Sequence, residues 1–343
     1  MSRRSLTLVI AGIGVVVAAA IAALLPVPYV ILSPGPTLNT LGRISSGPLI
    51  QVSGHPTYPT KGHLNLVTVS FVGGPGNGFN IFTALRGWLT PHDAVVPEQE
   101  LFPAGQSAQQ VVRQDTQQMT GSQQAATAAA LSVLKIHYAA VDTISGTEKG
   151  MPAASVLRRG DVITAVDGTP VTSTADAGTL IRRHSPGSRL NLTILRGGKT
   201  EHVTVKTADV NGHSVVGVLV TESFRFPFNV KIRVGNIGGP SAGLMFALGI
   251  VDKLTPGDLT GGKFVAGTGE ISPNGAVLPI GGIQQKLAGA RSAGATIFLT
   301  PAQNCADAKG AVPAGMRLVK VTSLQGALKD LAAIRAGHGV PGC

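Results

Sequence analysis

Charged residues, and acids above all, are scarce in this chain. Of its 343 residues, 28 are Lys or Arg and 17 are Asp or Glu, which gives a formal net charge of +11. Charged residues are only 13% of the chain, about half of the usual share. No acid precedes Asp93, so the positive balance reflects missing acids more than abundant bases. The hydrophobic share of 43% is too high for an intrinsically disordered protein and sufficient for a folded core.

Clusters of basic residues and aromatic side chains are also lacking. The longest basic runs are pairs such as Arg158-Arg159, whereas a nucleic-acid-binding domain gathers its bases in a patch or stripe. Aromatic residues, which would stack on unpaired bases, make up 4% of the chain. We therefore expect no nucleic-acid partner.

Cysteine is nearly absent, since only Cys305 and Cys343 occur. The chain has no Cys-x-x-Cys pair and no His/Cys cluster with metal-ligand spacing, so we expect neither a metal site nor a cofactor. In an oxidising compartment the two thiols would form a disulfide that holds the C-terminal tail, and elsewhere they would stay free. The sequence leaves both outcomes open.

An uncharged apolar run extends from Leu6 to Leu25 and is long enough to cross a bilayer as a helix. Arg3 and Arg4 precede it, so the positive-inside rule places residues 1–5 in the cytoplasm and the rest of the chain outside. A cleaved signal peptide is the alternative, because residues 18–20 are alanines. The run is longer than a usual signal sequence, which favours an uncleaved anchor over residues 6–25.

Beyond the anchor the pattern of the sequence changes twice. Gly62 to Val69 alternates in polarity like a half-buried strand, and Gln114 to Leu134 has the apolar spacing of a helix. Short strands and turns dominate residues 138–208. From Phe228 onward, strands alternate with helices. We therefore expect an α+β protein with a strand-rich module in the middle.

A glycine-flanked serine follows a strand in this last region and opens a helix. In Gly239-Pro240-Ser241-Ala242-Gly243 the glycines permit a sharp turn, and amides at a helix N-terminus can face a developing oxyanion. A structural N-cap role for the serine is the simpler interpretation. The pattern also fits the nucleophile elbow of α/β-hydrolases, but the only histidine downstream is His338, in a glycine-rich tail that would hold a base poorly.

A lysine can replace histidine as the base when burial removes its proton. Lys286 suits this role, because it is the only charged residue between Glu270 and Arg291. A solvated helix lysine is the alternative, and the position alone does not decide between them.

Three segments of the C-terminal third resemble the proteolytic domain of Lon proteases, in the same order and at similar spacing. They are Gly239–Gly243, Gly267–Ile271 and Asn274–Lys286. The resemblance implies that Ser241 is the nucleophile and Lys286 the general base, with Thr268 bonding the lysine or lining the pocket. The aspartate that the family usually carries three residues before the serine is Gly238 here.

The first part of the chain is similar to Lon as well, at Lys61–Val69 and Met119–Ala126. The Lon-like fold would therefore be split by the module at 138–208, which resembles a PDZ domain through Gly160–Ile163 and Val166–Gly168. A PDZ domain adds the C-terminal strand of a peptide to a sheet edge. The usual Gly-Leu-Gly-Phe carboxylate loop is missing, and residues 136–141 occupy its expected place.

The whole order resembles the membrane-anchored, PDZ-containing Lon-like proteases of Gram-positive bacteria, including actinobacteria. The resemblance implies a cytoplasmic tail at residues 1–5, an anchor at 6–25 and a first Lon-like part at 36–135. A PDZ-like domain follows at 138–208, then a proteolytic part with a Ser–Lys dyad at 214–336 and a C-terminal tail at 337–343.

This resemblance also predicts how the protein works. Without a phosphate loop or ATPase module we expect an ATP-independent serine endopeptidase, supported at the active site by Gly239, Pro240, Ala242 and Gly243. Protein or peptide substrates would be recruited or gated by the PDZ-like groove, and homo-oligomers occur in the family. The competing hypothesis is an exported, non-catalytic PDZ scaffold on an inactive protease fold.

Overall fold

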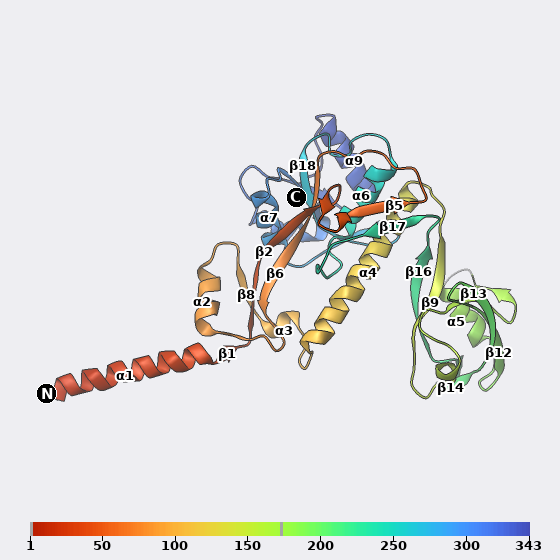
Figure 1. Cartoon of the computed structure of the whole chain (residues 1–343), viewed down its shortest axis with the longest axis horizontal. Helices are drawn as coiled ribbons and strands as arrows, with labels where there is room; N and C mark the ends of the chain where they lie inside the picture. Colours follow the sequence, from red (N-terminus) through yellow and green to blue (C-terminus); the bar gives the residue numbers. More distant parts are fainter. Residues whose placement is uncertain (1–2, 172–173) are drawn as a thin grey trace. The chain divides into compact units, whose positions relative to one another are not determined.

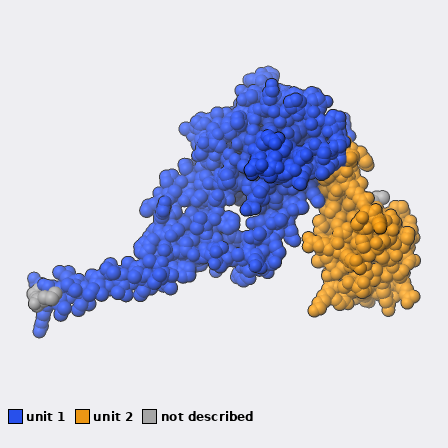
Figure 2. Space-filling view, in the orientation of Figure 1, with its two compact units in different colours: residues 1–135, 228–343 blue, residues 136–227 orange. Residues whose placement is uncertain are grey.

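The computed structural model describes residues 3–171 and 174–343, which form two compact units (Figure 1 and Figure 2). Unit 1 combines Met1–Lys135 with Phe228–Cys343, and unit 2 is Ile136–Pro227. Unit 1 is therefore assembled from two stretches of sequence that unit 2 separates. Both units mix helices with strands, in agreement with the fold class expected from the sequence.

Unit 1 is built on a six-stranded sheet in the order β22-β21-β18-β6-β2-β8. Its strands are β22 (Arg317–Val321), β21 (Ile297–Pro301), β18 (Phe264–Gly267), β6 (His63–Gly73), β2 (Tyr29–Asn39) and β8 (Ala94–Pro97). The first four run parallel, and β2 is antiparallel to both of its neighbours. The proline-containing stretch Ser33–Pro36 is part of β2, whose register against β6 shifts between Pro34 and Thr37.

Four helices of unit 1 cover the sheet and position the site. They are α4 (Ala108–Val133), α6 (Gly243–Leu254), α7 (Ile283–Ser292) and α9 (Leu324–Arg335). The apolar helix α6 is almost entirely buried between β6, α4 and α9, whereas α7 packs against β2 and β6. Ser107 starts α4 with a capping box that it shares with Gln110. Helix α6 is therefore a central element of the core of unit 1.

Shorter elements complete unit 1. The helices are α1 (Arg3–Leu24), α2 (Ile81–Leu89), α3 (Glu98–Leu101), α8 (Cys305–Lys309) and the 3-10 turn Ala302–Asn304. Four antiparallel pairs join β1 (Pro26–Val27) with β7 (Phe79–Asn80), β3 (Arg43–Ile44) with β4 (Gly47–Pro48), β5 (Ile50–Ser53) with β17 (Asn229–Ile232), and β19 (Glu270–Ile271) with β20 (Val277–Leu278).

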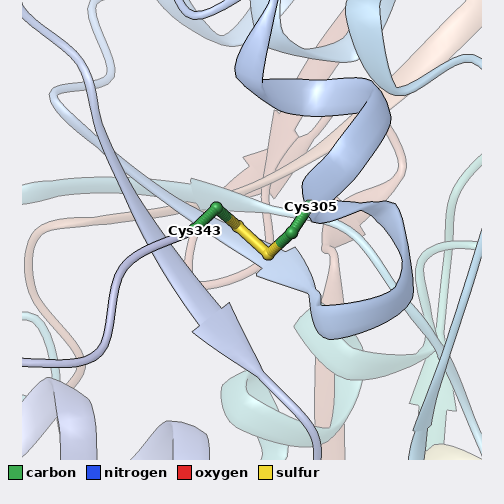
Figure 3. Close-up of a disulfide and its surroundings, with 2 residues drawn as sticks. All are labelled: Cys305 and Cys343. Atoms are coloured by element: carbon green, nitrogen blue, oxygen red, sulfur yellow. A yellow bond between two sulfur atoms is a disulfide. The ribbon is translucent and has the colours of Figure 1, made fainter.

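The C-terminal tail is held by a disulfide between Cys305 and Cys343, whose Cα atoms are 5.1 Å apart (Figure 3). The Lys320 amide also donates to the carbonyl of Pro341 at 3.0 Å. The structure thus selects the disulfide from the two outcomes that the sequence left open. By loop-closure entropy, a cross-link over 38 residues contributes about 4 kcal/mol to stability.

Unit 2 is a β-rich domain whose sheet has the order β13-β12-β10-β9-β16, with β11 beside β10. Its elements are β9 (Ala139–Thr147), the 3-10 turn Pro152–Ser155, β10 (Val162–Val166), β11 (Thr169–Pro170), α5 (Thr174–Arg182), β12 (Arg189–Arg196), β13 (Lys199–Lys206), β14 (Ala208–Val210), β15 (His213–Val215) and β16 (Val218–Arg225). The sequence assigned residues 214–227 to the proteolytic part. The structure includes them in unit 2 because β16 pairs with β9 along its whole length.

The Gly160–Ile163 motif has a structural role in unit 2. Asp161 is fully buried and receives hydrogen bonds from the Arg196 guanidinium at 2.7 and 2.8 Å and from the Arg158 amide at 2.8 Å. Burial alone would raise the pKa of Asp161, but these donors hold it below its usual value. The aspartate therefore ties β12 to the loop before β10.

Candidate active site

The Ser241 turn connects the loop after β17 to the N-terminus of α6. Gly239 has a φ of +80°, which only glycine adopts without strain. Gly243 has no room for a side chain, because a Cβ there would lie 2.7 Å from Ile271 Cγ2 and 3.0 Å from Ser122 Oγ. Both flanking glycines are thus required by the geometry of the turn.

Helix α4 holds this turn from the side. The Gly239 amide donates to the Asp115 carbonyl at 3.2 Å, and Ser122 Oγ donates to the Pro240 carbonyl at 2.8 Å. Asp115, Met119 and Ser122 lie at positions i, i+4 and i+7, so they share one face of the helix. The turn is therefore fixed by residues more than 100 positions earlier in the chain.

Thr268 is fully buried and bonds the Ser241 turn rather than Lys286. Its Oγ1 donates to the Ser241 carbonyl at 2.9 Å, and the Gly269 amide donates to the same oxygen at 2.8 Å. We expected Thr268 to bond Lys286 or line the pocket. The structure instead uses Thr268 to fix the peptide unit of Ser241.

The backbone amides of Ser241 and Ala242 are candidate donors to a bound group. Within residues 3–171 and 174–343, neither amide donates to a backbone or side-chain acceptor. They stand at the N-terminus of α6, where the unpaired amides and the helix dipole favour negative charge. Unpaired amides at a helix N-terminus are the kind of donor that stabilises an oxyanion.

Lys286 lies in the first turn of α7, and the turn before it is held tightly. Gly282 has a φ of +65°, and a Cβ there would come within 2.7 Å of Val69. The side-chain amide of Asn304 forms two bonds with Ile280: it accepts from the amide and donates to the carbonyl, both at 2.9 Å. Asn304 is thus a positioning residue for the Lys286 turn.

The Lys286 side chain is only 4% exposed. Over the part of the chain that the structure describes, it forms no ion pair. Burial lowers the pKa of Lys286 to about 7 because the charged ammonium loses its hydration. A large fraction of this amine is therefore neutral at physiological pH and able to accept a proton.

Ser241 and Lys286 line one cleft of about 1380 Å³ in unit 1. Its walls come from β2, β6, α4, residues 232–242 and the turn at Gly281 and Gly282. This volume accommodates several residues of an extended peptide. His338, the base of the alternative hydrolase hypothesis, is exposed in the C-terminal tail and does not line the cleft.

Asp115 is a cleft residue that the sequence did not single out. A Cβ added at Gly238 would lie 2.6 Å from Asp115 Cβ, so Asp115 fills the space beside this glycine. Burial raises the pKa of Asp115. Asp115 of α4 therefore lies beside the position at which the family usually carries an aspartate, a proximity that only the tertiary structure reveals.

Unit 2 contains a separate, mostly apolar groove of about 340 Å³. One wall is α5, with Ala177, Gly178 and Ile181, and the other is the stretch 214–220 that leads into β16. Gly217 has a φ of +77° at this point, and the Met151 side chain occupies the space of any Cβ. The outer edge of β16 is the edge of the sheet.

Comparison with known proteins identifies two families along the chain. A family model of the PDZ domain matches residues 136–207, and one of the Lon protease (S16) C-terminal proteolytic domain matches residues 229–332. Lon protease 2 of Herpetosiphon aurantiacus is 46% identical over 69 residues, 20% of this chain and 8% of that protein. The Lon protease of Syntrophomonas wolfei is 29% identical over 175 residues, 45% of this chain and 21% of that protein.

Solved structures with similarity to this chain include PDZ domains. That of an SdrC-like protein from Listeria monocytogenes is 26% identical, with a TM-score of 0.22, and covers 23% of this chain and 85% of that one. The chain spans only 8% to 21% of the length of the Lon proteases above. Together, the sequence matches support a serine protease of the Lon type that also carries a PDZ domain.

The bond from Ser122 predicts that Ser122→Ala lowers the turnover number and leaves KM nearly unchanged. The Pro240 carbonyl would lose its buried donor, which costs about 1–3 kcal/mol, and the Ser241 turn would loosen. Steady-state kinetics and urea denaturation measure the two effects. Thr127→Val is the control, because it removes a buried hydroxyl of α4 that bonds only Gln123. Equal kinetics for Ser122→Ala and the wild type would contradict this role.

Proposed function

We propose that this chain is a membrane-anchored serine endopeptidase in which Lys286 activates Ser241 for attack on a peptide bond. The observation that carries the proposal is the buried, unpaired Lys286 amine, which lines the same cleft as Ser241. Its lowered pKa supports a role as general base. The match to the Lon proteolytic domain supports the same reaction class.

The residues support a two-step reaction in which the nucleophile is used and restored. Neutral Lys286 takes the proton from Ser241 Oγ, which forms a bond to the scissile carbonyl carbon. The resulting ammonium gives that proton to the leaving nitrogen as the C–N bond breaks, leaving an acyl-enzyme. Water then loses a proton to Lys286 as its oxygen bonds to the acyl carbon. As the ester bond from that carbon to Ser241 Oγ breaks, the lysine returns this proton to Oγ, and the acyl product leaves as a carboxylic acid.

The amides of Ser241 and Ala242 are our candidates for the oxyanion donors. Their lack of partners in the described chain and their place at the N-terminus of α6 support this assignment. Thr268 and Gly269 would act indirectly by fixing the Ser241 carbonyl.

Anchoring by α1 is supported by the length and composition of this helix, none of whose described residues is buried. Arg3 and Arg4 support an N-terminus in the cytoplasm. The disulfide supports an oxidising compartment for the remaining residues. Substrates would then be exported or membrane-proximal proteins.

We also propose that the groove of unit 2 binds the C-terminus of a peptide. Val216-Gly217-Val218 has the apolar-Gly-apolar pattern of the carboxylate loop that the sequence had seemed to lack, and it lines the groove before the free-edge strand β16. The loop lies between β15 and β16 instead of preceding β9. Residues 136–141, where it was expected, include the start of β9, which pairs with β16.

The dyad is tested by removing the nucleophile and the base in turn. Ser241→Ala and Lys286→Arg should each lower hydrolysis of an unstructured protein at least about 100-fold, because arginine does not give up its proton. The full chain in detergent is assayed by peptide release. Lys286→Met shows whether a neutral side chain of similar length restores activity, which we do not expect. Lys263→Met, at an exposed lysine, is the control.

The same experiment distinguishes the competing function. A folded wild type that cleaves no unstructured protein, and that is indistinguishable from Ser241→Ala, would identify the chain as a non-catalytic PDZ scaffold.

The pKa of Lys286 predicts the pH dependence of kcat/KM. The base works only when neutral, so kcat/KM should rise as the pH increases through about 7 and level off above it. An ordinary solvated lysine would place this rise near 10.4. Initial rates at low substrate concentration measure the profile, and Ser122→Ala should keep its midpoint. A midpoint close to that of a free lysine would remove Lys286 from the role of base.

Peptide capture is tested by filling the groove of unit 2. Gly178→Met adds a side chain to α5 where only the flexible Arg182 guanidinium is close, 3.2 Å from a built Cβ. Binding of a peptide with an apolar C-terminal residue should weaken about tenfold or more, since burial of such a side chain is worth about 1.5–3 kcal/mol. Fluorescence anisotropy measures this. The amidated peptide is the matched ligand control, and equal affinity for it would contradict carboxylate recognition.

A further inference from the structure

Helix α2 packs with its small residues inward and its large apolar residues outward. Ala84 and Gly87 are buried, and a Cβ at Gly87 would lie 2.9 Å from Val95 on β8 and 3.1 Å from Ile31 on β2. The exposed side chains are Phe82, Leu85, Trp88 and Leu89, of which Trp88 is 54% and Leu89 84% exposed. Their spacing places them along one side of the helix.

This face begins where the apolar helix α1 ends. Asn80 caps α2 by accepting from the Thr83 amide at 3.0 Å, and its Nδ2 donates to the carbonyl of Ala23 at 3.0 Å. Strand β1, just after α1, pairs with β7, just before α2. Figure 1 shows α2 beside the C-terminal end of α1. Helix α2 therefore begins directly beside the end of α1.

The chemistry of the face suits the border between lipid and water. Helix α2 contains no acid, and its only charge is Arg86, in the last turn. Trp88 packs edge-on against Tyr29, with ring centroids 6.1 Å apart. Tryptophan and tyrosine gather at membrane interfaces, and helices with an apolar face and basic residues lie in that plane.

We propose that α2 is a second lipid contact, which lies in the interface of the bilayer that α1 spans. The inference rests on the proposed anchoring by α1. Because α2 packs on β2, whose residues Leu32 and Pro36 line the cleft, the contact would keep the cleft close to the membrane surface. Substrates would then be cleaved within a short distance of the bilayer.

Trp88 reports on this contact directly because it is the only tryptophan in the chain. The full chain is reconstituted into phosphatidylcholine vesicles whose acyl chains carry bromine either near the glycerol end or near the methyl end. We expect Trp88 fluorescence to be quenched at least about twofold, and more strongly by bromine near the glycerol end, since interfacial helices lie at that depth.

Flotation of the vesicles after carbonate extraction separates the two hypotheses. A chain that does not float with the vesicles overturns the anchor, and with it this inference. A chain that floats but whose Trp88 is quenched by neither lipid overturns the inference alone. Cross-linking of α2 between two copies in that case would identify a second chain as the occupant of the face.

A charge on the face should remove the contact without unfolding the protein. Leu89→Asp changes a side chain that is almost fully in solvent, so the melting temperature should stay the same while quenching of Trp88 falls at least about twofold. The control is Val312→Asp, at an exposed apolar residue between α8 and β22. Full quenching in Leu89→Asp would contradict a lipid contact of this face.

Discussion

The site depends on keeping one amine buried without a counter-charge. Lowering the pKa of Lys286 from 10.5 to about 7 corresponds to about 5 kcal/mol against the charged form, at 1.36 kcal/mol for each pKa unit. Packing must hold the lysine in place, because a mobile side chain would reach water. The Gly281-Gly282 turn and the two bonds of Asn304 to Ile280 provide that restraint. The fold thus holds Lys286 in surroundings that favour its neutral amine.

The Ser241 turn depends on a second constraint, because hydrogen bonds from residues distant in sequence hold it. Asp115 and Ser122 come from the first segment of unit 1, whereas Ser241 and Thr268 come from the second. The Pro240 and Ser241 carbonyls are bonded from opposite sequence segments, so neither segment alone builds the turn. The geometry of the Ser241 turn therefore requires that both parts of unit 1 assemble.

The sequence predicted those site residues that a distinctive local pattern marks. Ser241 between glycines and the isolated Lys286 stood out because glycine turns and lone charges are rare features. Asp115 and Ser122 could not be found this way, since their role is a contact across 118 positions in the case of Ser122 and Pro240. Strand β16 was assigned to the wrong unit because its partner β9 lies about 80 residues earlier. The sequence did not decide whether Cys305 and Cys343 form a disulfide, because the spacing of cysteines does not determine their pairing.

The pairing of β9 with β16 also affects how the chain folds. Ala139 lies opposite Arg225 in this ladder, so the two ends of unit 2 are held about 5 Å apart once it has folded. Folded unit 2 therefore connects the two segments of unit 1 through closely spaced ends, whereas unfolded unit 2 would connect them through a long flexible loop. Loop-closure entropy grows with loop length. Folding of unit 2 therefore lowers the entropic cost of bringing α4 and α6 together. This favours a folding order in which unit 2 folds before unit 1.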